Sequence, residues 1–225
     1  MAVTASLGLW QLGRASQKMA LHEQIESRSR EPVLTAGPLL AATDSQALLH
    51  RNVRLQGHWV PRHTVFLDNR QMNGLPGFFV VTPLRLQGSD THILVQRGWV
   101  PRDFQDRTRL PVIATPDDAL VEVQGRLTPP PAKLYELGEA GGGPIRQNID
   151  LDAFSAETGL ELLALSVLQD GPDTGDGLLR AWPRIESGVA KHHGYAFQWF
   201  GLCALAAVLF VWFQLIAPRR KPSSP

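Results

Sequence analysis

The chain has 225 residues, a formal net charge of +1 and a single cysteine. This length permits one domain of ordinary size with short appendages, and the balanced charge creates no overall field that would attract nucleic acid. A single cysteine excludes an intramolecular disulfide framework, although a domain of about 150 residues can bury enough surface to fold without one.

The N-terminal stretch MAVTASLGL is mildly apolar and precedes a segment that favours a helix. We expect residues 1–9 to be the remnant of a truncated first membrane anchor, because they are too few to span a bilayer and lack the basic region of a signal peptide. An inverted topology is the alternative. The helix is predicted from Trp10 to about Ser29, and Pro32 ends it.

The middle of the chain contains alternating or apolar segments that predict strands. These segments are VRLQGHWV, TVFLDNR, FFVVTPLRL, HILVQRGWV and LVEVQGRL. The first two are expected to form a hairpin across a turn at Pro61 and Arg62, with NGLPG as the next loop. DLDAFSAETG predicts a short helix that Gly159 ends, and LELLALSVLQD predicts a strand or a short buried element.

The order of these elements predicts an α+β fold with a β-rich, barrel-like or curved-sheet extracytoplasmic domain. We assign residues 10–191 to this domain, which we expect to be periplasmic. An N-terminal helix and a C-terminal transmembrane helix frame it.

The run Tyr195–Ala217 contains no Asp, Glu, Lys, Arg or His. At about 1.5 Å per residue it is about 34 Å long, which is enough to cross a hydrocarbon core of about 30 Å. We therefore predict a transmembrane helix over residues 192–217. The basic cluster Arg219–Lys221 follows it, and under the positive-inside rule this cluster predicts a cytoplasmic tail over residues 218–225.

Signatures of catalysis are absent from the sequence. The glycine-rich GEAGGGP lacks the Lys-Ser/Thr pair of a P-loop, and no Gly-x-Ser-x-Gly, His-Glu-x-x-His or cysteine pair occurs. His58 and His63 flank the Val-Pro turn, but no third metal ligand accompanies them, so exposed histidines are the favoured interpretation. We therefore expect that the protein is not an enzyme.

The segment VQRGWVPRD places Arg97, Trp99 and Arg102 around Gly98. Glycine allows a backbone conformation that a side chain would block. From the residues alone, a bulge and turn with the tryptophan in the core is favoured over a ligand site.

Two histidines stand at the entry of the predicted membrane helix. One face of that helix carries residues at helical spacing, namely His192, Tyr195, Ala196, Trp199 and Cys203. His193 points about 100° away. A neutral imidazole is a common haem ligand, and the aromatic and small residues could form a flat apolar slot for a porphyrin. The alternative, which the residues alone favour, is a polar pair at the interface.

Several segments in a fixed order carry a resemblance to a known family. They are LGLWQLGRASQK, VRLQGHW, DNRQMNGLPGFFVVTPL, HILVQRGWVP and the Trp-Pro of AWP followed by HHGYAFQWFGL. Together they span nearly the whole chain, which resembles the surfeit locus protein 1 family of cytochrome c oxidase assembly proteins.

The resemblance implies a respiratory-chain assembly factor that binds haem a and assists its insertion into oxidase subunit I. It implies a bacterial inner-membrane protein with a periplasmic domain and a cytoplasmic C-terminus, whose other partners are the haem a synthesis machinery and membrane lipid. His192 matches the family's histidine and would ligate the iron, whereas His193 stands where the family usually has an aliphatic residue.

The same resemblance suggests Tyr195 and Trp199 as residues lining the haem pocket. Arg97 or Arg14 would pair with the haem propionates, because guanidinium suits carboxylate. Two alternatives stay open. One is a structural chaperone of subunit I that does not handle haem, and the other is a membrane-anchored periplasmic enzyme.

Overall fold

The computed structural model describes residues 1–106, 109–116, 118–134, 143–172, 174–182 and 189–216. The chain divides into two compact units, Met1–Gln24 with Arg184–Pro225, and Ile25–Pro183. We call the first the helical unit and the second the β-domain. The predicted cytoplasmic tail, its basic cluster and the proline of the Trp-Pro motif lie outside the described residues.

The helical unit is built from two helices. They are α1 (Ala2–Ser29) and α4 (Val189–Val211), and the short π-helix η3 (Trp212–Ile216) continues α4. The prediction that the first helix begins at Trp10 is wrong, because no residue before Pro32 interrupts helical geometry and α1 extends back to Ala2. Within the described residues, Val189–Gln214 is the one helix long and apolar enough to cross a membrane, with a mean hydropathy of 1.9.

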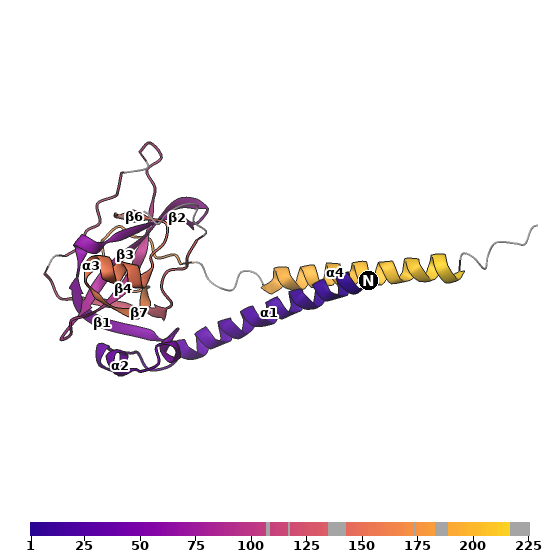
Figure 1. The fold of residues 1–225 in the computed structure, drawn as a ribbon, viewed down its shortest axis with the longest axis horizontal. Helices are drawn as coiled ribbons and strands as arrows, with labels where there is room; N and C mark the ends of the chain where they lie inside the picture. Colours follow the sequence, from indigo (N-terminus) through magenta and orange to yellow (C-terminus); the bar gives the residue numbers. More distant parts are fainter. Residues whose placement is uncertain (107–108, 117, 135–142, 173, 183–188, 217–225) are drawn as a thin grey trace, which may run out of the picture. The chain divides into compact units, whose positions relative to one another are not determined.

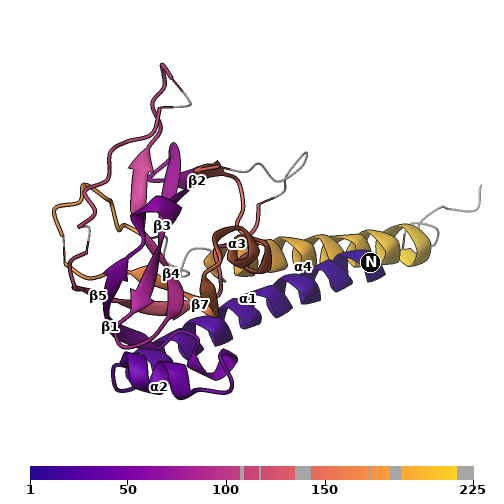
Figure 2. The same ribbon diagram turned by 60° about the vertical axis from the view of Figure 1, so that its left-hand side comes forward.

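The two helices lie side by side and antiparallel (Figure 1, Figure 2). The Sγ atom of Cys203 lies 3.5 Å from the carbonyl oxygen of Met1, and Gly8 lies against the ring of Phe200 farther along. A Cβ atom at Gly8 would stand 2.7 Å from that ring, so glycine permits the close approach of the helices here.

The β-domain is built on one mixed sheet, which contains both antiparallel and parallel pairs of strands. The strand order is β1-β5-β7-β4-β3-β2-β6. The strands are β1 (Asn52–Trp59), β2 (Val65–Met72), β3 (Leu75–Leu86), β4 (Thr91–Pro101), β5 (Val121–Thr128), β6 (Ile145–Arg146) and β7 (Glu161–Gln169). Because β1 pairs with both β5 and β3, strands β1, β5, β7, β4 and β3 close into a small barrel (Figure 2). The predicted barrel-like α+β fold is confirmed.

The predicted hairpin between the first two strands is wrong. The short 3-10 helix η2 (Pro61–His63) redirects the chain, and β1 ends against β3 with Trp59 opposite Leu84. The hairpin partner of β2 is β3. Asn73 and Gly74 connect them with φ angles of 51° and 79°, so NGLPG contributes only a two-residue turn.

Short helices pack against the sheet. They are α2 (Ala36–Ala41), the 3-10 helix η1 (Gln46–Leu48) and α3 (Leu151–Thr158). The predicted α3 is confirmed, because the carboxylate of Asp150 accepts from the backbone N–H of Ala153 at its start and Gly159 ends it at a φ of 71°. LELLALSVLQD forms the strand β7.

The main core fills the barrel with aliphatic side chains and Trp59. The alternation predicted for the first strand is confirmed, since Val53, Leu55 and Trp59 are buried. Because side chains fill the barrel, we look for functional residues in the helical unit and on the outer surface of the barrel.

Candidate functional site

The face predicted to carry the haem slot is the face of α4 that packs on α1. Its less exposed residues recur at helical spacing, namely His192, Ala196, Trp199 and Cys203. The opposing residues of α1 recur in the same way, namely Gly8, Gln11 and Ala15. Ala196 is only 2% exposed. The centre of this face is therefore covered by α1.

His192 is oriented by a residue near the other end of the chain. Its Nδ1 atom lies 2.6 Å from Oε1 of Gln11. An amide oxygen only accepts hydrogen bonds, so Nδ1 donates to Gln11, and in the neutral form of the ring the lone pair is then on Nε2. Metal-binding histidines typically donate their other ring N–H to such a partner.

The second ring nitrogen of His192 has no hydrogen-bond partner among the described residues, and it is not one of the buried unpartnered nitrogens. No described residue therefore uses Nε2 of His192. A metal-binding histidine presents a ring nitrogen in this way.

Arg14 lies in the same unit as His192. Arg14 is exposed, its guanidinium lies 5.5 Å from the ring centre of Trp10, and its Nη1 donates a 3.4 Å hydrogen bond to Gln17. It has no ion pair among the described residues, so it is available to a carboxylate.

The other predicted residues of α4 are more open. Tyr195 is 52% exposed, His193 is exposed, and Trp199 is half-buried in the seam. His193 has no hydrogen bond among the described residues, so the structure orients only one imidazole of the pair. Trp199 and His192 share a face, as predicted.

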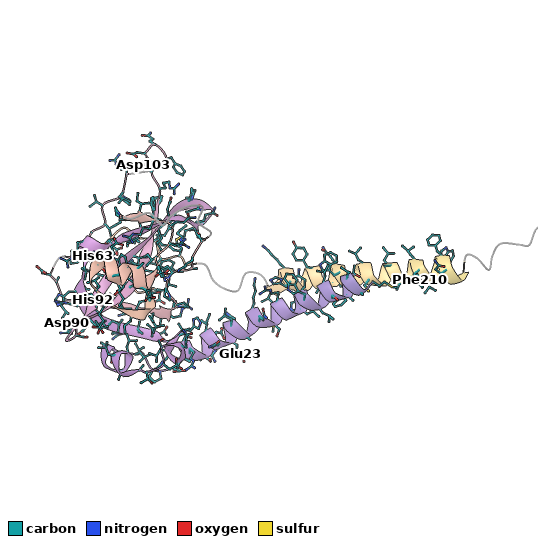
Figure 3. The ribbon with its side chains drawn as sticks, in the orientation of Figure 1. Glu23, His63, Asp90, His92, Asp103 and Phe210 are labelled. Carbon is teal, nitrogen blue, oxygen red and sulfur yellow. The ribbon has the colours of Figure 1, made fainter. Side chains whose placement is uncertain are left out.

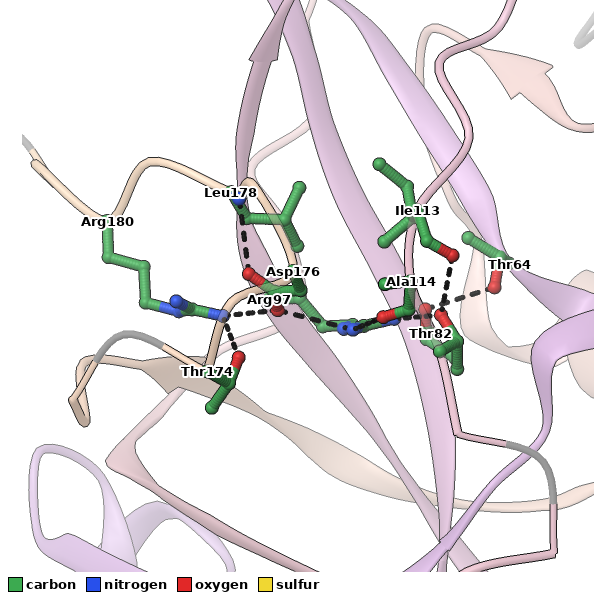
Figure 4. A network of polar contacts seen from close by, with 10 residues as sticks. Thr64, Thr82, Arg97, Ile113, Ala114, Thr174, Asp176, Leu178 and Arg180 are labelled. Carbon is green, nitrogen blue, oxygen red and sulfur yellow. Dashed lines mark hydrogen bonds and ion pairs between the residues drawn. The ribbon is translucent and has the colours of Figure 1, made fainter.

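Arg97 lies in the β-domain within a network of polar contacts (Figure 4). It is 2% exposed. Its Nη2 lies 3.2 Å from the carboxylate of Asp176, and its guanidinium stacks 4.7 Å from the ring centre of Trp59. Asp176 also pairs with Arg180 at 2.6 Å. Burial lowers the pKa of Arg97, and Asp176 opposes that shift. A haem propionate could meet this guanidinium only by displacing Asp176.

The predicted bulge around Gly98 is confirmed. The pairing of β3 with β4 passes from Gly98 to Gln96, so Arg97 is the extra residue. Trp99 is in the core, and its indole donates a 2.9 Å hydrogen bond to the carbonyl of Arg70. A Cβ at Gly98 would stand 2.6 Å from Leu178, so glycine admits the segment that carries Asp176.

No group of three or more His, Cys, Asp or Glu side chains suited to a metal ion occurs in the part of the chain that the structure describes. His63 accepts a 3.1 Å hydrogen bond from Arg62 at its Nε2. Gln11 was not among the site residues predicted from the sequence. Its spacing of three residues from Gly8 and four from Ala15 was the signal that could have placed it in the seam.

This chain is similar to proteins of one family. The model of the SURF1 family matches residues 1–204. The SURF1-like protein of Rickettsia felis is 26% identical over 221 residues, which cover 94% of this chain and 92% of that protein. Surfeit locus protein 1 of Rattus norvegicus is 29% identical over 245 residues, covering 98% and 74%. The cytochrome oxidase assembly protein SHY1 of Saccharomyces cerevisiae is 25% identical over 174 residues, covering 74% and 44%.

Proposed function

The chain belongs to the SURF1 family, and we propose that it acts in cytochrome oxidase assembly as a membrane-anchored protein that binds haem a. The observation that carries the haem assignment is the hydrogen bond between Gln11 and Nδ1 of His192. It leaves a free Nε2 lone pair at the edge of the helix pair, where an iron could be ligated.

The residues of the helical unit fit the proposed group. His192 would provide the nitrogen that ligates the iron, and the exposed guanidinium of Arg14 would pair with a propionate. Tyr195 and Trp199 would contact the porphyrin from the same helix. Haem a, when bound, supplies an iron that accepts the imidazole lone pair.

The proposed task is carriage and hand-over. The chain would receive haem a from the machinery that synthesises it and assist its insertion into subunit I. No bond of the haem is made or broken, so the protein is not an enzyme in this proposal. Because a carrier must also release its cargo, we expect moderate affinity, set in part by how often the competent conformation is populated.

The proposed location is the bacterial inner membrane. The span Val189–Gln214 would anchor the chain in lipid, and the basic residues after it in the sequence favour a cytoplasmic C-terminus. The β-domain would then stand in the periplasm.

The test is to purify the full chain from cells that make haem a and to record its absorption spectrum. His192→Ala is expected to lose the bound-haem absorption, whereas His193→Ala retains it. Equal haem content in the His192→Ala variant and the parent would overturn the ligand assignment. If that variant also supports oxidase assembly in full, a structural chaperone of subunit I without haem handling becomes the better description.

A further inference from the structure

A row of basic side chains crosses the outer surface of the barrel. Three residues stand directly opposite one another on β1, β3 and β4, namely His58, Arg85 and His92. Directly opposite side chains point to one face of a sheet and lie close together. The next row, Trp59, Leu84 and Ile93, belongs to the core. The basic row therefore faces outward.

This row lines a hollow of about 420 Å³, a size typical of sites for small molecules. Arg62 of η2 adds a second guanidinium, and Asp118 is the acidic residue among those that line the hollow. Figure 3 labels His92 at this side of the β-domain, with His63 and Asp90 nearby.

The charges in the hollow are incompletely balanced. Arg85 has no ion pair among the described residues, and Arg62 donates to the neighbouring His63 rather than to a carboxylate. Asp90 lies in the turn between β3 and β4, near His92, and does not line the hollow.

His92 is the most buried of the basic residues that line the hollow, with 8% of its surface exposed. Burial lowers the pKa of His92, and the charge of Arg85 also lowers it. Contacts of the ring with the backbone of Glu161 and with Asp90 oppose this shift. His92 therefore forms the inner wall of the hollow, and the two exposed guanidinium groups offer the charged donors.

We infer that this hollow binds a small oxyanion, a phosphate or carboxylate group, held by Arg62 and Arg85 with His58 and His92 beside it. Guanidinium groups present parallel N–H donors that match the two oxygens of such a group. The carboxylate of Asp118 would oppose the anion by like-charge repulsion. The site lies wholly within the β-domain and does not depend on haem binding.

The experiment uses the full chain in a maltoside detergent, which contains no phosphate. Inorganic phosphate and acetate are titrated separately, with chloride at matched ionic strength as the control, and the ring resonances of His92 are followed by NMR. We expect a saturable shift with one or both oxyanions, together with a rise in the thermal unfolding temperature. Saturation by phosphate alone or acetate alone identifies the group that the site prefers.

Substitutions of the arginines and of the aspartate in the hollow should change the affinity for the oxyanion in opposite directions. Arg85→Gln should weaken the affinity at least about tenfold, because it removes a charged donor pair, and Arg62→Gln should act in the same direction. Asp118→Asn should strengthen binding. Arg54→Gln is the matched control, since Arg54 is an exposed arginine of β1 that pairs with Glu122 at 3.6 Å and does not line the hollow.

Several results would overturn the inference. They are the absence of a saturable response to either oxyanion, equal weakening by Arg54→Gln and Arg85→Gln, and unchanged binding in Asp118→Asn. Because Arg62 and Arg85 are both exposed, we expect both variants to fold. If one of them fails to fold, the other still tests the site.

Discussion

Gln11 of α1 accepts a 2.6 Å hydrogen bond from Nδ1 of His192 on α4. The two residues come from opposite ends of the sequence, and their bond lies in a seam of small side chains around Gly8 and Ala196. A polar contact between two helices fixes their rotation as well as their spacing. The pair therefore sets both the proton position on the imidazole and the direction of its free nitrogen.

The first prediction concerns this orienting bond. Gln11→Ala should reduce haem affinity about 10–100-fold, because outer-shell partners of a ligating histidine typically have effects of that size. Gln11→Glu retains an acceptor and should retain binding. The measurement is haem titration of the purified chain, with Gln198→Ala, an exposed position of α4, as control.

A readout without haem separates orientation from general damage. The ¹⁵N chemical shifts of His192 should report a proton on Nδ1 in the parent and a mixture of tautomers in Gln11→Ala. Unchanged shifts and unchanged affinity in that variant would contradict the role given to Gln11. If the unmodified chain binds no haem, that result would instead contradict the proposed function.

The second prediction concerns the close approach of the two helices. Gly8→Leu should lower the thermal unfolding temperature of the helical unit, because even a Cβ would stand 2.7 Å from the ring of Phe200. Gly13→Leu has open space around its Cβ position. It should leave the temperature unchanged or raise it, since leucine favours helix over glycine. Equal effects of the two variants, measured in detergent by helical circular dichroism, would show that the Gly8 contact is unimportant.

Much of the β-domain could be predicted from local sequence. The strand periods and the end of α3 at Gly159 depend on neighbouring residues, and the structure has them as predicted. The pairing of strands could not be read in the same way. The turn at Pro61 resembles a hairpin turn in sequence, yet β1 finds its partner in β3, because closing the barrel buries Trp59 against Leu84.

Only part of the candidate site could be predicted from the sequence. The helical spacing of His192 and Trp199 predicts their common face, and the structure has them on one face. The identity of the helix that covers this face depends on a contact between distant segments, so Gln11 was not found. The partner of Arg97 could not be predicted either, because Asp176 is far away in the sequence. Arg97 reaches it as the extra residue of a bulge in β4.

The third prediction concerns the buried ion pairs around Asp176. Asp176→Ala should destabilise the β-domain by about 3–5 kcal/mol, because it leaves the buried guanidinium of Arg97 without its counter-charge. Glu122→Ala breaks the exposed pair with Arg54 and the exposed hydrogen bond from Gln124, and it should cost at most about 1 kcal/mol. Urea unfolding followed by tryptophan fluorescence measures both. Similar midpoints for the two variants would mean that the buried pair contributes no more than an exposed one.

The fourth prediction concerns the acid sensitivity of the β-domain. Burial lowers the pKa of His92 and of His50 below the ordinary value of 6.5. Between that value and each folded-state pKa, the unfolded chain binds more protons than the folded one, so the free energy of unfolding falls as the pH drops below 6.5.

The measurement is the free energy of unfolding of the full chain in urea as a function of pH between neutrality and mild acid. His92→Gln should flatten the dependence below the ordinary histidine pKa, because its side chain cannot take up a proton in either state. His50→Gln should remove a separate part of the slope, since the charges of Arg126 and Arg28 also lower the pKa of His50. If His92→Gln keeps the full slope of the parent, the folded state tolerates a charged imidazole at this position and the buried ring is not the source of the acid sensitivity.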